Sequence, residues 1–186
     1  MRILQKSMFT AILMAAGSLV VAQEEAPKSF KVSAVTFERP PSWKWVKPTS
    51  SMRKAQLKVV STEPKGAADV VFFYFGPGGA GGKDANIQRW FRKFKGARTE
   101  KNSKRETKNI AGVPVTFVKA AGIYNDSPPF GAPRWVDNHA LLGAIIEAKS
   151  GSIFVRLTGP DELASKLEPE FKRMIEGGVR GTQKND

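Results

Sequence analysis

The run Val-Val-Phe-Phe-Tyr-Phe at residues 70–75 constrains the fold more than any other feature of the sequence. Successive side chains of a strand point to opposite faces of a sheet, so a strand without polar positions has both faces covered. The run therefore predicts a central strand, at residues 69–75, with a further layer of structure on each side. Further strands are expected where apolar residues alternate or form short runs, at residues 30–35, 55–61, 104–109, 113–124, 139–149 and 152–158.

Residues 84–94 carry the single apolar stripe of an amphipathic helix. Four side chains at i, i+3, i+4 and i+7 form this stripe: Ile87, Trp90, Phe91 and Phe94. Asp84 is expected to cap the N-terminus, because its side chain can accept hydrogen bonds from the free amides of the first turn. The aromatic side chains of the stripe are therefore expected in the core rather than on a binding surface.

A second amphipathic helix is expected after Gly159-Pro160-Asp161, and Gly177 is expected to end it. Its apolar stripe has four members: Leu163, Leu167, Phe171 and Met174. Pro169 lies inside this segment and predicts a kink or two abutting helices, because proline removes an intrahelical hydrogen bond.

The order of these segments indicates the fold class. Consecutive strands joined by short turns pair antiparallel, and turns at residues 63–66, 110–112 and 150–151 join three such pairs. Two helices with one apolar stripe each can then cover the two faces of the sheet. The sequence therefore predicts an α+β fold, with a mostly antiparallel sheet flanked by two main helices in an α/β/α sandwich.

The N-terminus has the three parts of a secretory signal peptide. Arg2 and Lys6 precede an apolar run at residues 8–21, and Val20-Val21-Ala22 offers a cleavage site. The run is shorter than the roughly 20 residues that span a membrane, so we expect cleavage near Ala22 rather than an uncleaved anchor. The chain would then be exported, either to a periplasm or out of the cell.

Removal of residues 1–22 would leave a flexible leader at 23–28, a single domain at 29–177 and a flexible tail at 178–186. The sequence contains no cysteine, which excludes disulfides, thiolate metal ligands and attachment as a lipoprotein. No segment after the signal peptide is long and apolar enough to predict a transmembrane helix.

The chain is strongly basic, with 30 Lys and Arg against 17 Asp and Glu, and its basic residues concentrate at 83–108. Five side chains of this tract are candidates for a binding face: Arg89, Arg92, Lys93, Lys95 and Arg98. Such a patch attracts polyanions such as nucleic acid, anionic lipid or acidic wall polymers. The alternative is a solvated helix face that only keeps the protein soluble. Because the interleaved aromatics belong to the core stripe, we expect weak association with polyanions or anionic membranes and no specific nucleic acid.

Aromatic residues in two proline-rich segments are a further candidate. Trp43 and Trp45 follow the first strand, while Phe130, Arg134 and Trp135 belong to a long loop at residues 125–137. Loops of this length inside a compact domain are often functional, and an exposed tryptophan can anchor a partner. The alternative is that these side chains close the ends of the core.

Residues with catalytic or metal-binding chemistry are few. Glycines at 76, 78 and 81 have the spacing of a dinucleotide-binding loop, but the flanking strands read as hairpins rather than a parallel βαβ unit. His139 is the single histidine, near Asp137, and no serine in a nucleophile context accompanies it. We therefore expect no cofactor, no metal site, no catalytic residue and no enzymatic activity.

The segment Phe37-Glu38-Arg39-Pro40-Pro41-Ser42-Trp43 resembles the Phe-x-x-Pro-x-x-Trp entry of PsbP-like domains. The helix after a central strand and the final strand running into Gly159-Pro160 and a last helix are also similar. In layout the chain is similar to a group of uncharacterised exported bacterial proteins with this fold. The resemblance implies an α/β/α sandwich and little about activity, since members serve as assembly or accessory subunits with unlike partners.

Together these features lead to three functional expectations. The first is an exported, non-catalytic accessory domain that binds a protein partner in the cell envelope through the long loop and the Trp43/Trp45 edge. The second is a basic module that associates with an anionic polymer or membrane surface through its basic helix face. An enzyme is the third.

Overall fold

The computed structural model describes residues 26–48, 50–96, 102–128 and 131–183. The expected signal peptide and its cleavage site near Ala22 lie outside these ranges. Within them, no helix is both long enough and apolar enough to cross a membrane.

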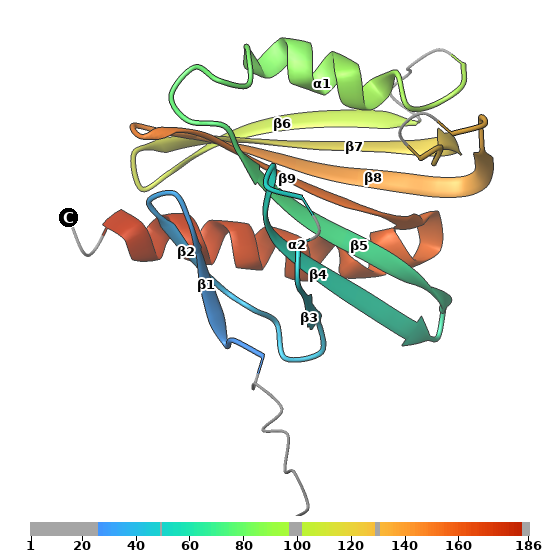
Figure 1. Cartoon of the computed structure of the whole chain (residues 1–186), viewed down its shortest axis with the longest axis horizontal. Coiled ribbons are helices and arrows are strands. Elements are labelled where there is room, and N and C mark those ends of the chain that lie inside the picture. The colour runs from blue at the N-terminus through green and yellow to red at the C-terminus, as the bar shows by residue number, and fades with distance from the viewer. Residues whose placement is uncertain (1–25, 49, 97–101, 129–130, 184–186) are drawn as a thin grey trace, which may run out of the picture.

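The fold consists of a small hairpin, a large sheet and two helices (Figure 1). The hairpin is formed by β1 (Ser29–Val32) and β2 (Val35–Glu38). The sheet has seven strands in the order β3-β4-β5-β9-β8-β7-β6, and each neighbouring pair is antiparallel. Its strands are β3 (Lys44–Val46), β4 (Arg53–Thr62), β5 (Lys65–Tyr74), β6 (Ser103–Ile110), β7 (Val113–Asn125), β8 (Trp135–Ala148) and β9 (Gly151–Pro160).

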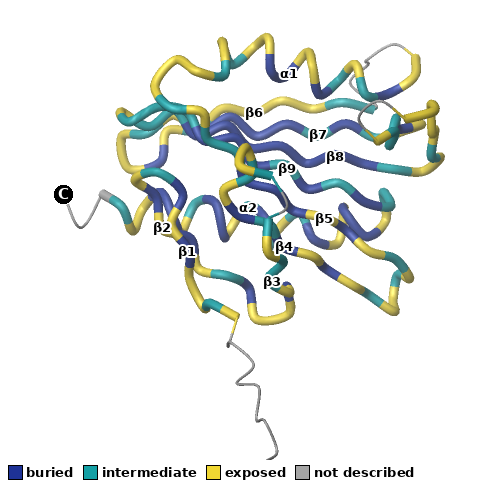
Figure 2. The backbone as a smooth tube through the Cα atoms, in the orientation of Figure 1, coloured by how far each residue is buried: buried dark blue, intermediate teal, exposed yellow. Residues whose placement is uncertain are grey.

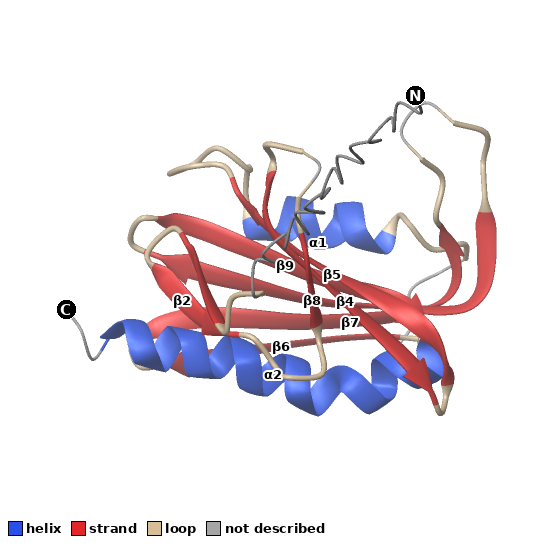
Figure 3. Ribbon diagram, turned by 60° about the horizontal axis from the view of Figure 1, so that its bottom comes forward, coloured by secondary structure: helices blue, strands red, loops and turns tan. Residues whose placement is uncertain are grey.

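The helices α1 (Lys83–Phe91) and α2 (Asp161–Gln183) lie on opposite faces of this sheet (Figure 3). This arrangement confirms the predicted α+β fold, in which a mostly antiparallel sheet is flanked by two main helices. The larger core lies under α2 and also includes the β1–β2 hairpin, while a smaller core lies under α1. Figure 2 shows the buried stretch along β7 and β8 between these layers.

The apolar run in β5 is placed as expected. This strand lies inside the sheet, between β4 and β9. Val70 and Phe72 belong to the core under α2, whereas Phe73 packs against the core under α1. The two faces of the strand thus meet two different layers, which is the physical reason why no charged residue interrupts the run at residues 70–75.

Several expected elements differ in the structure. The helix expected over residues 84–94 ends at Phe91, and Phe94 lies beyond it in a β-bridge. Residues 30–35 are not one strand but the two arms of the β1–β2 hairpin, which turns at Ser33 with a left-handed φ of 53°. Asp84 does not cap α1: Gly82 occupies the N-cap position without a side-chain bond, and Asp84 forms an ion pair of 2.7 Å with Arg105 on β6. A carboxylate in the first turn still stabilises the helix, because its negative charge interacts favourably with the positive end of the helix dipole.

The end of α2 is a correction as well. The helix does not stop at Gly177 but continues to Gln183, so residues 178–183 are not a flexible tail. Val179 is buried in the core under α2, and this burial outweighs the low helix propensity of the two glycines. Pro169 lies within a continuous helix rather than between two helices.

Candidate functional site

The chain that leaves α1 is fixed against the end of β7. Phe94 forms an isolated β-bridge with Tyr124. The Lys95 amide donates to the Ile123 carbonyl at 2.9 Å, and the Asn125 amide donates to the Lys93 carbonyl at 2.7 Å. The basic residues that follow α1 are therefore held in place by backbone hydrogen bonds.

Trp135 lies beside this segment because β8 begins there and pairs with Asn125 of β7. Its ring is 40% exposed, and the Lys95 ammonium lies 4.5 Å from the ring centroid. Ile123, 39% exposed, shares the backbone contact with Lys95. We call Lys93, Lys95, Ile123, Arg134 and Trp135 the Trp135 surface; it lies where α1 and β7 end and β8 begins (Figure 1, right).

The Trp135 surface joins residues from both sets of sequence candidates. Lys93 and Lys95 come from the basic tract, whereas Arg134 and Trp135 come from the predicted long loop. That loop is shorter than expected, since β7 continues to Asn125 and β8 begins at Trp135. Arg134 forms an ion pair with Asp126, and its amide donates to the Ser127 hydroxyl at 2.7 Å.

Four other candidate residues have different outcomes. Phe130 and Arg98 lie outside the described residues. Trp43 is fully buried, and its indole nitrogen donates to Glu170 Oε2 at 2.9 Å. Trp45 is half-buried in β3, with its ring 5.4 Å from that of Phe30. The expected partner-binding edge at Trp43 and Trp45 is therefore wrong for Trp43, because the closing helix and the sheet enclose its side chain.

The basic face of α1 keeps its positive charge. Arg89 donates to Asn86 Oδ1 at 2.8 Å, a neutral partner, and Arg92 is exposed. Among the described residues, no carboxylate lies within ion-pair distance of Arg89, Arg92, Lys93 or Lys95. By contrast, the flanking cations Lys83 and Arg105 are paired with Glu147 and Asp84. The free positive charge therefore collects on the second half of α1 and the segment after it.

His139 packs flat against Tyr124, with ring centroids 5.7 Å apart and an interplanar angle of 13°. Burial lowers the pKa of His139 below its ordinary value, and the charge of Asp126 partly opposes this change. Burial raises the pKa of Tyr124, partly opposed by Arg156. The histidine is thus oriented by a ring stack. In the described part of the chain no three His, Asp or Glu side chains cluster as metal ligands would.

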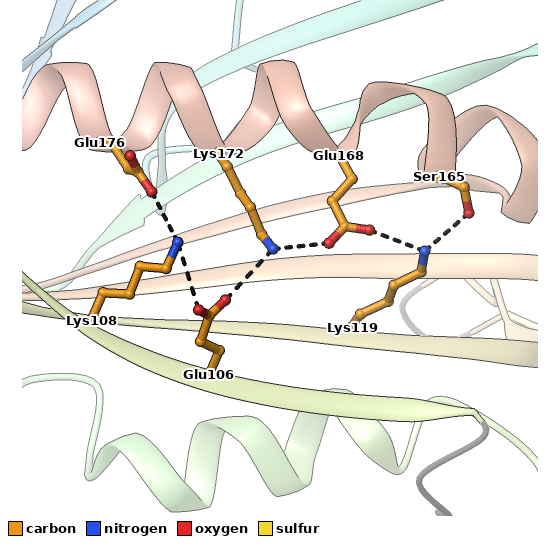
Figure 4. Close-up of polar contacts among 7 residues, drawn as sticks. All are labelled: Glu106, Lys108, Lys119, Ser165, Glu168, Lys172 and Glu176. Atoms are coloured by element: carbon orange, nitrogen blue, oxygen red, sulfur yellow. Dashed lines mark hydrogen bonds and ion pairs between the residues drawn. The ribbon is translucent and has the colours of Figure 1, made fainter.

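Sequence reasoning missed a network of ion pairs that joins α2 to the edge of the sheet (Figure 4). Glu168 contacts Lys119 at 3.1 Å and Lys172 at 3.0 Å, and Glu106 on β6 contacts Lys172 at 3.7 Å. Lys108 continues the network to Glu106 and Glu176. The i,i+4 spacing of Glu168 and Lys172 was visible in the sequence, but the partners on β6 and β7 depend on the packing of α2.

The cleft beside this network, between α2 and the β6–β7 edge, has a volume of about 610 Å³. Burial raises the pKa of Glu168, but hydrogen bonds and charges from Lys172 and Lys119 outweigh it, so the pKa lies below its ordinary value. The lysines and glutamates of the network satisfy one another. These ion pairs attach α2 to the sheet, and they leave little unpaired charge with which to bind a ligand.

The glycine-rich segment between β5 and α1 does not form a dinucleotide-binding unit. Such a unit needs a parallel strand next to β5, but both neighbours of β5 are antiparallel to it. Gly76, Gly78 and Gly81 have positive φ angles of 82°, 70° and 74°. The glycines therefore allow the backbone turns of this loop, which other residues would adopt only with strain.

Comparisons with known proteins concern the fold. A scan against protein-family models and a search of curated proteins found no match. Among solved structures, the chain is similar to the solution structure of cyanobacterial PsbP (CyanoP) from Synechocystis sp. PCC 6803. The sequence identity is 12%, the match covers 88% of this chain and 95% of that chain, and the TM-score is 0.49. At this identity and TM-score the similarity carries no argument about the fold or the function of this chain.

Proposed function

We propose that this protein is an exported, non-catalytic accessory domain that captures a protein partner through the Trp135 surface. The observation that carries the proposal is the contact between the Lys95 ammonium and the exposed ring of Trp135. Tryptophan is among the residues most enriched in the hot spots of protein interfaces, and the lysine beside this one adds a positive charge at the same place.

The surface is suited to binding because its backbone is fixed before a partner arrives. Backbone hydrogen bonds from Lys95 to Ile123 and from Asn125 to Lys93 hold the chain after α1 on the end of β7, and Asn125 pairs with Trp135 of β8. Less conformational entropy is then lost on association. Single exposed apolar residues are common, but Trp135 and Ile123 lie on adjoining strand ends and Lys95 contacts both.

The charge of the surface indicates an acidic partner. Lys93 and Lys95 form no ion pair within the described residues, and Arg92 lies next to them in sequence. An acidic protein surface would neutralise them and steer the encounter. The three groups with displaced pKa values support a non-catalytic role, because a ring stack holds His139 and Tyr124 and ion pairs hold Glu168.

Crosslinked capture from the cell envelope fraction at low and high salt tests the proposal. Trp135→Ala should abolish capture of the partner, whereas Val60→Ala, which shortens an exposed residue on β4, should leave it intact. Both variants should show the thermal unfolding of the unchanged protein. Equal capture by Trp135→Ala, or equal loss with Val60→Ala, would contradict the proposal.

A second function is favoured by the unpaired cations of α1. Arg89, Arg92 and Lys93 could hold the protein on an anionic polymer or membrane surface. Binding to phosphatidylglycerol vesicles should then weaken steeply with salt and with Arg92→Gln, but not with Trp135→Ala. If a protein partner stays bound at high salt and is lost with Trp135→Ala, the result favours the protein interface over the anionic surface.

A further inference from the structure

A second cleft, separate from the one beside α2, lies on the face of the sheet that α1 covers. It does not include the contact between Lys95 and Trp135. It is a cleft of about 190 Å³ between α1 and strands β5 and β9. Its polar lining residues are Asn86, Arg89, Lys93 and Arg156, and the rest of its lining is aromatic. Neither Trp135 nor Lys95 lines it. We call it the Arg156 cleft.

Arg156 is an unusual residue at this position. It lies on β9, the middle strand of the seven-stranded sheet. Its Nε is buried and has no hydrogen-bond partner among the described residues, and no described carboxylate forms an ion pair with it. Its guanidinium carbon lies 5.8 Å from the centroid of the Phe73 ring. Among the described residues, no hydrogen bond or ion pair engages the guanidinium group of Arg156, so its charge is available to a ligand in the cleft that it lines.

Arg89 is held at the same cleft with its charge available. Asn86 is buried and donates from Nδ2 to the carbonyls of Ala80 and Gly82, at 2.9 and 3.0 Å. Its Oδ1 therefore points in a fixed direction and accepts from Arg89 Nη1. A neutral amide orients the guanidinium without cancelling its charge. With Lys93, the cleft has three cations and no acidic lining residue.

The apolar part of the cleft is built from rings. The Phe75 ring is 43% exposed and stacks on Phe73, with centroids 6.2 Å apart and planes at 11°. The Phe154 ring centroid lies 6.4 Å from that of Phe75 and 6.4 Å from that of Trp90, to whose plane it is nearly perpendicular. An exposed ring that already forms part of a stack offers its free side to another flat group.

We propose that the Arg156 cleft binds a small carboxylate that carries an aromatic ring. The carboxylate binds Arg156 and Arg89, since guanidinium groups recognise carboxylates through paired hydrogen bonds. The ring packs against Phe75 and Phe73. The volume is below the range of drug-sized ligand pockets, which limits the occupant to about one ring and a short acidic arm.

This chemistry has two sources, a free aromatic acid or the C-terminal aromatic residue of a peptide. The inference goes beyond the proposed partner capture: the cleft shares Lys93 with the Trp135 surface but includes neither Trp135 nor Lys95. Trp135→Ala should therefore leave binding at the cleft unchanged. Loss of one activity without the other separates the two proposals.

The test measures binding of 4-fluorophenylacetate to the purified protein by ¹⁹F NMR. 4-Fluorophenylacetamide, which has the same ring without the charge, is the control ligand. The acid should bind at least about tenfold more tightly than the amide, because a charge-assisted hydrogen bond is lost in the amide. Arg156→Gln should weaken binding of the acid by about tenfold or more. Arg92→Gln, on the same helix segment but outside the cleft, should change it less than about twofold.

Two peptides ending in phenylalanine, one with a free carboxylate and one amidated, distinguish the sources. Tighter binding of the free-acid peptide, with displacement of the fluorinated acid, identifies a peptide C-terminus. Binding of the fluorinated acid alone identifies a free aromatic acid. Equal binding of acid and amide, equal effects of Arg156→Gln and Arg92→Gln, or no binding of either acid would overturn the proposal. The comparison of acid with amide needs no variant, so it decides even where Arg156→Gln unfolds the protein.

Discussion

The indole nitrogen of Trp43 donates a 2.9 Å hydrogen bond to Oε2 of Glu170, although 127 positions separate the two residues. The bond joins the segment before β3 to the middle of α2. Trp43 is fully enclosed, so the bond satisfies a donor that water cannot reach. The residue that the sequence placed at a partner-binding edge thus attaches the closing helix to the core.

Trp43→Ala is expected to lower the free energy of unfolding by about 3–5 kcal/mol, because it removes a large ring from the core. Glu170→Leu should cost about 1–3 kcal/mol by leaving the buried indole N–H without an acceptor, and Glu170→Gln should cost less. Urea unfolding measures all three. A Trp43→Ala protein of unchanged stability that fails to capture its partner would instead restore Trp43 as an interface residue.

Adjacent glycines near the end of α2 give a matched pair of substitutions. A methyl group at Gly177 meets no atom within 4 Å, so Gly177→Ala should stabilise the protein by about 0.5–1 kcal/mol. A methyl group at Gly178 would lie 2.8 Å from Phe37 Cδ1 and 3.0 Å from the Thr36 carbonyl oxygen. Gly178→Ala should therefore destabilise by about 1–3 kcal/mol.

Thermal unfolding of the two variants tests whether α2 continues past Gly177 against the β1–β2 hairpin. Opposite shifts of Tm are expected. Two shifts near zero would mean that residues 178–183 behave in solution as the flexible tail expected from the sequence.

The sequence was sufficient for the fold class but not for the positions of the binding residues. The alternation of apolar and polar residues and the apolar run of β5 follow from local strand geometry. They therefore indicate where most strands lie and that both faces of the sheet are covered. Trp43 followed prolines and looked like part of a loop, and only the packing of α2 encloses it. The glycines near the end of α2 similarly suggested a stop, while burial of Val179 continues the helix.

The Trp135 surface and the Arg156 cleft also arise from contacts between distant segments. Lys95 reaches Trp135 because β7 pairs with both the chain after α1 and the start of β8. Arg156 alternates with apolar residues along β9, a pattern that does not distinguish a cleft residue from a solvent-facing one. Its neighbours from α1 and β5 turn that position into the floor of a cleft, which no local pattern reveals.

Gly143 on β8 is expected to allow α1 to pack closely on the sheet, because Trp90 of α1 lies directly over it. A methyl group there would overlap the Trp90 ring and lie 2.6 Å from Val118 Cγ2. Gly143→Ala should therefore destabilise by about 1–3 kcal/mol, because Trp90 must shift away from the sheet. The double variant Gly143→Ala/Trp90→Leu should lose less than the sum of its single changes, as expected for residues in contact. Additive losses in urea unfolding would argue against this packing.

Glu168 should stabilise the folded protein at neutral pH, and this stabilisation should be lost in acid. Its folded-state pKa lies below the ordinary value of 4.5, so the stabilisation is present above that pH and is lost as pH falls through the folded-state pKa. Glu168→Gln should therefore be less stable than the unchanged protein at neutral pH, with the difference disappearing in strong acid. Urea unfolding across pH measures the difference. A constant difference at every pH would mean that Glu168 acts through packing and not through its charge.

His139 should act in a separate and higher pH range. Burial keeps its folded-state pKa below 6.5, so between the folded and unfolded values the unfolded chain binds more protons. The free energy of unfolding therefore falls as pH decreases below about 6.5, the value of a free histidine. His139→Phe keeps a flat ring beside Tyr124 and removes the proton site, so its stability should not fall in this range. Urea unfolding of both proteins between neutral pH and the onset of Glu168 protonation tests this. If the unchanged protein gains stability on acidification relative to His139→Phe, then a charge partner rather than burial governs the histidine.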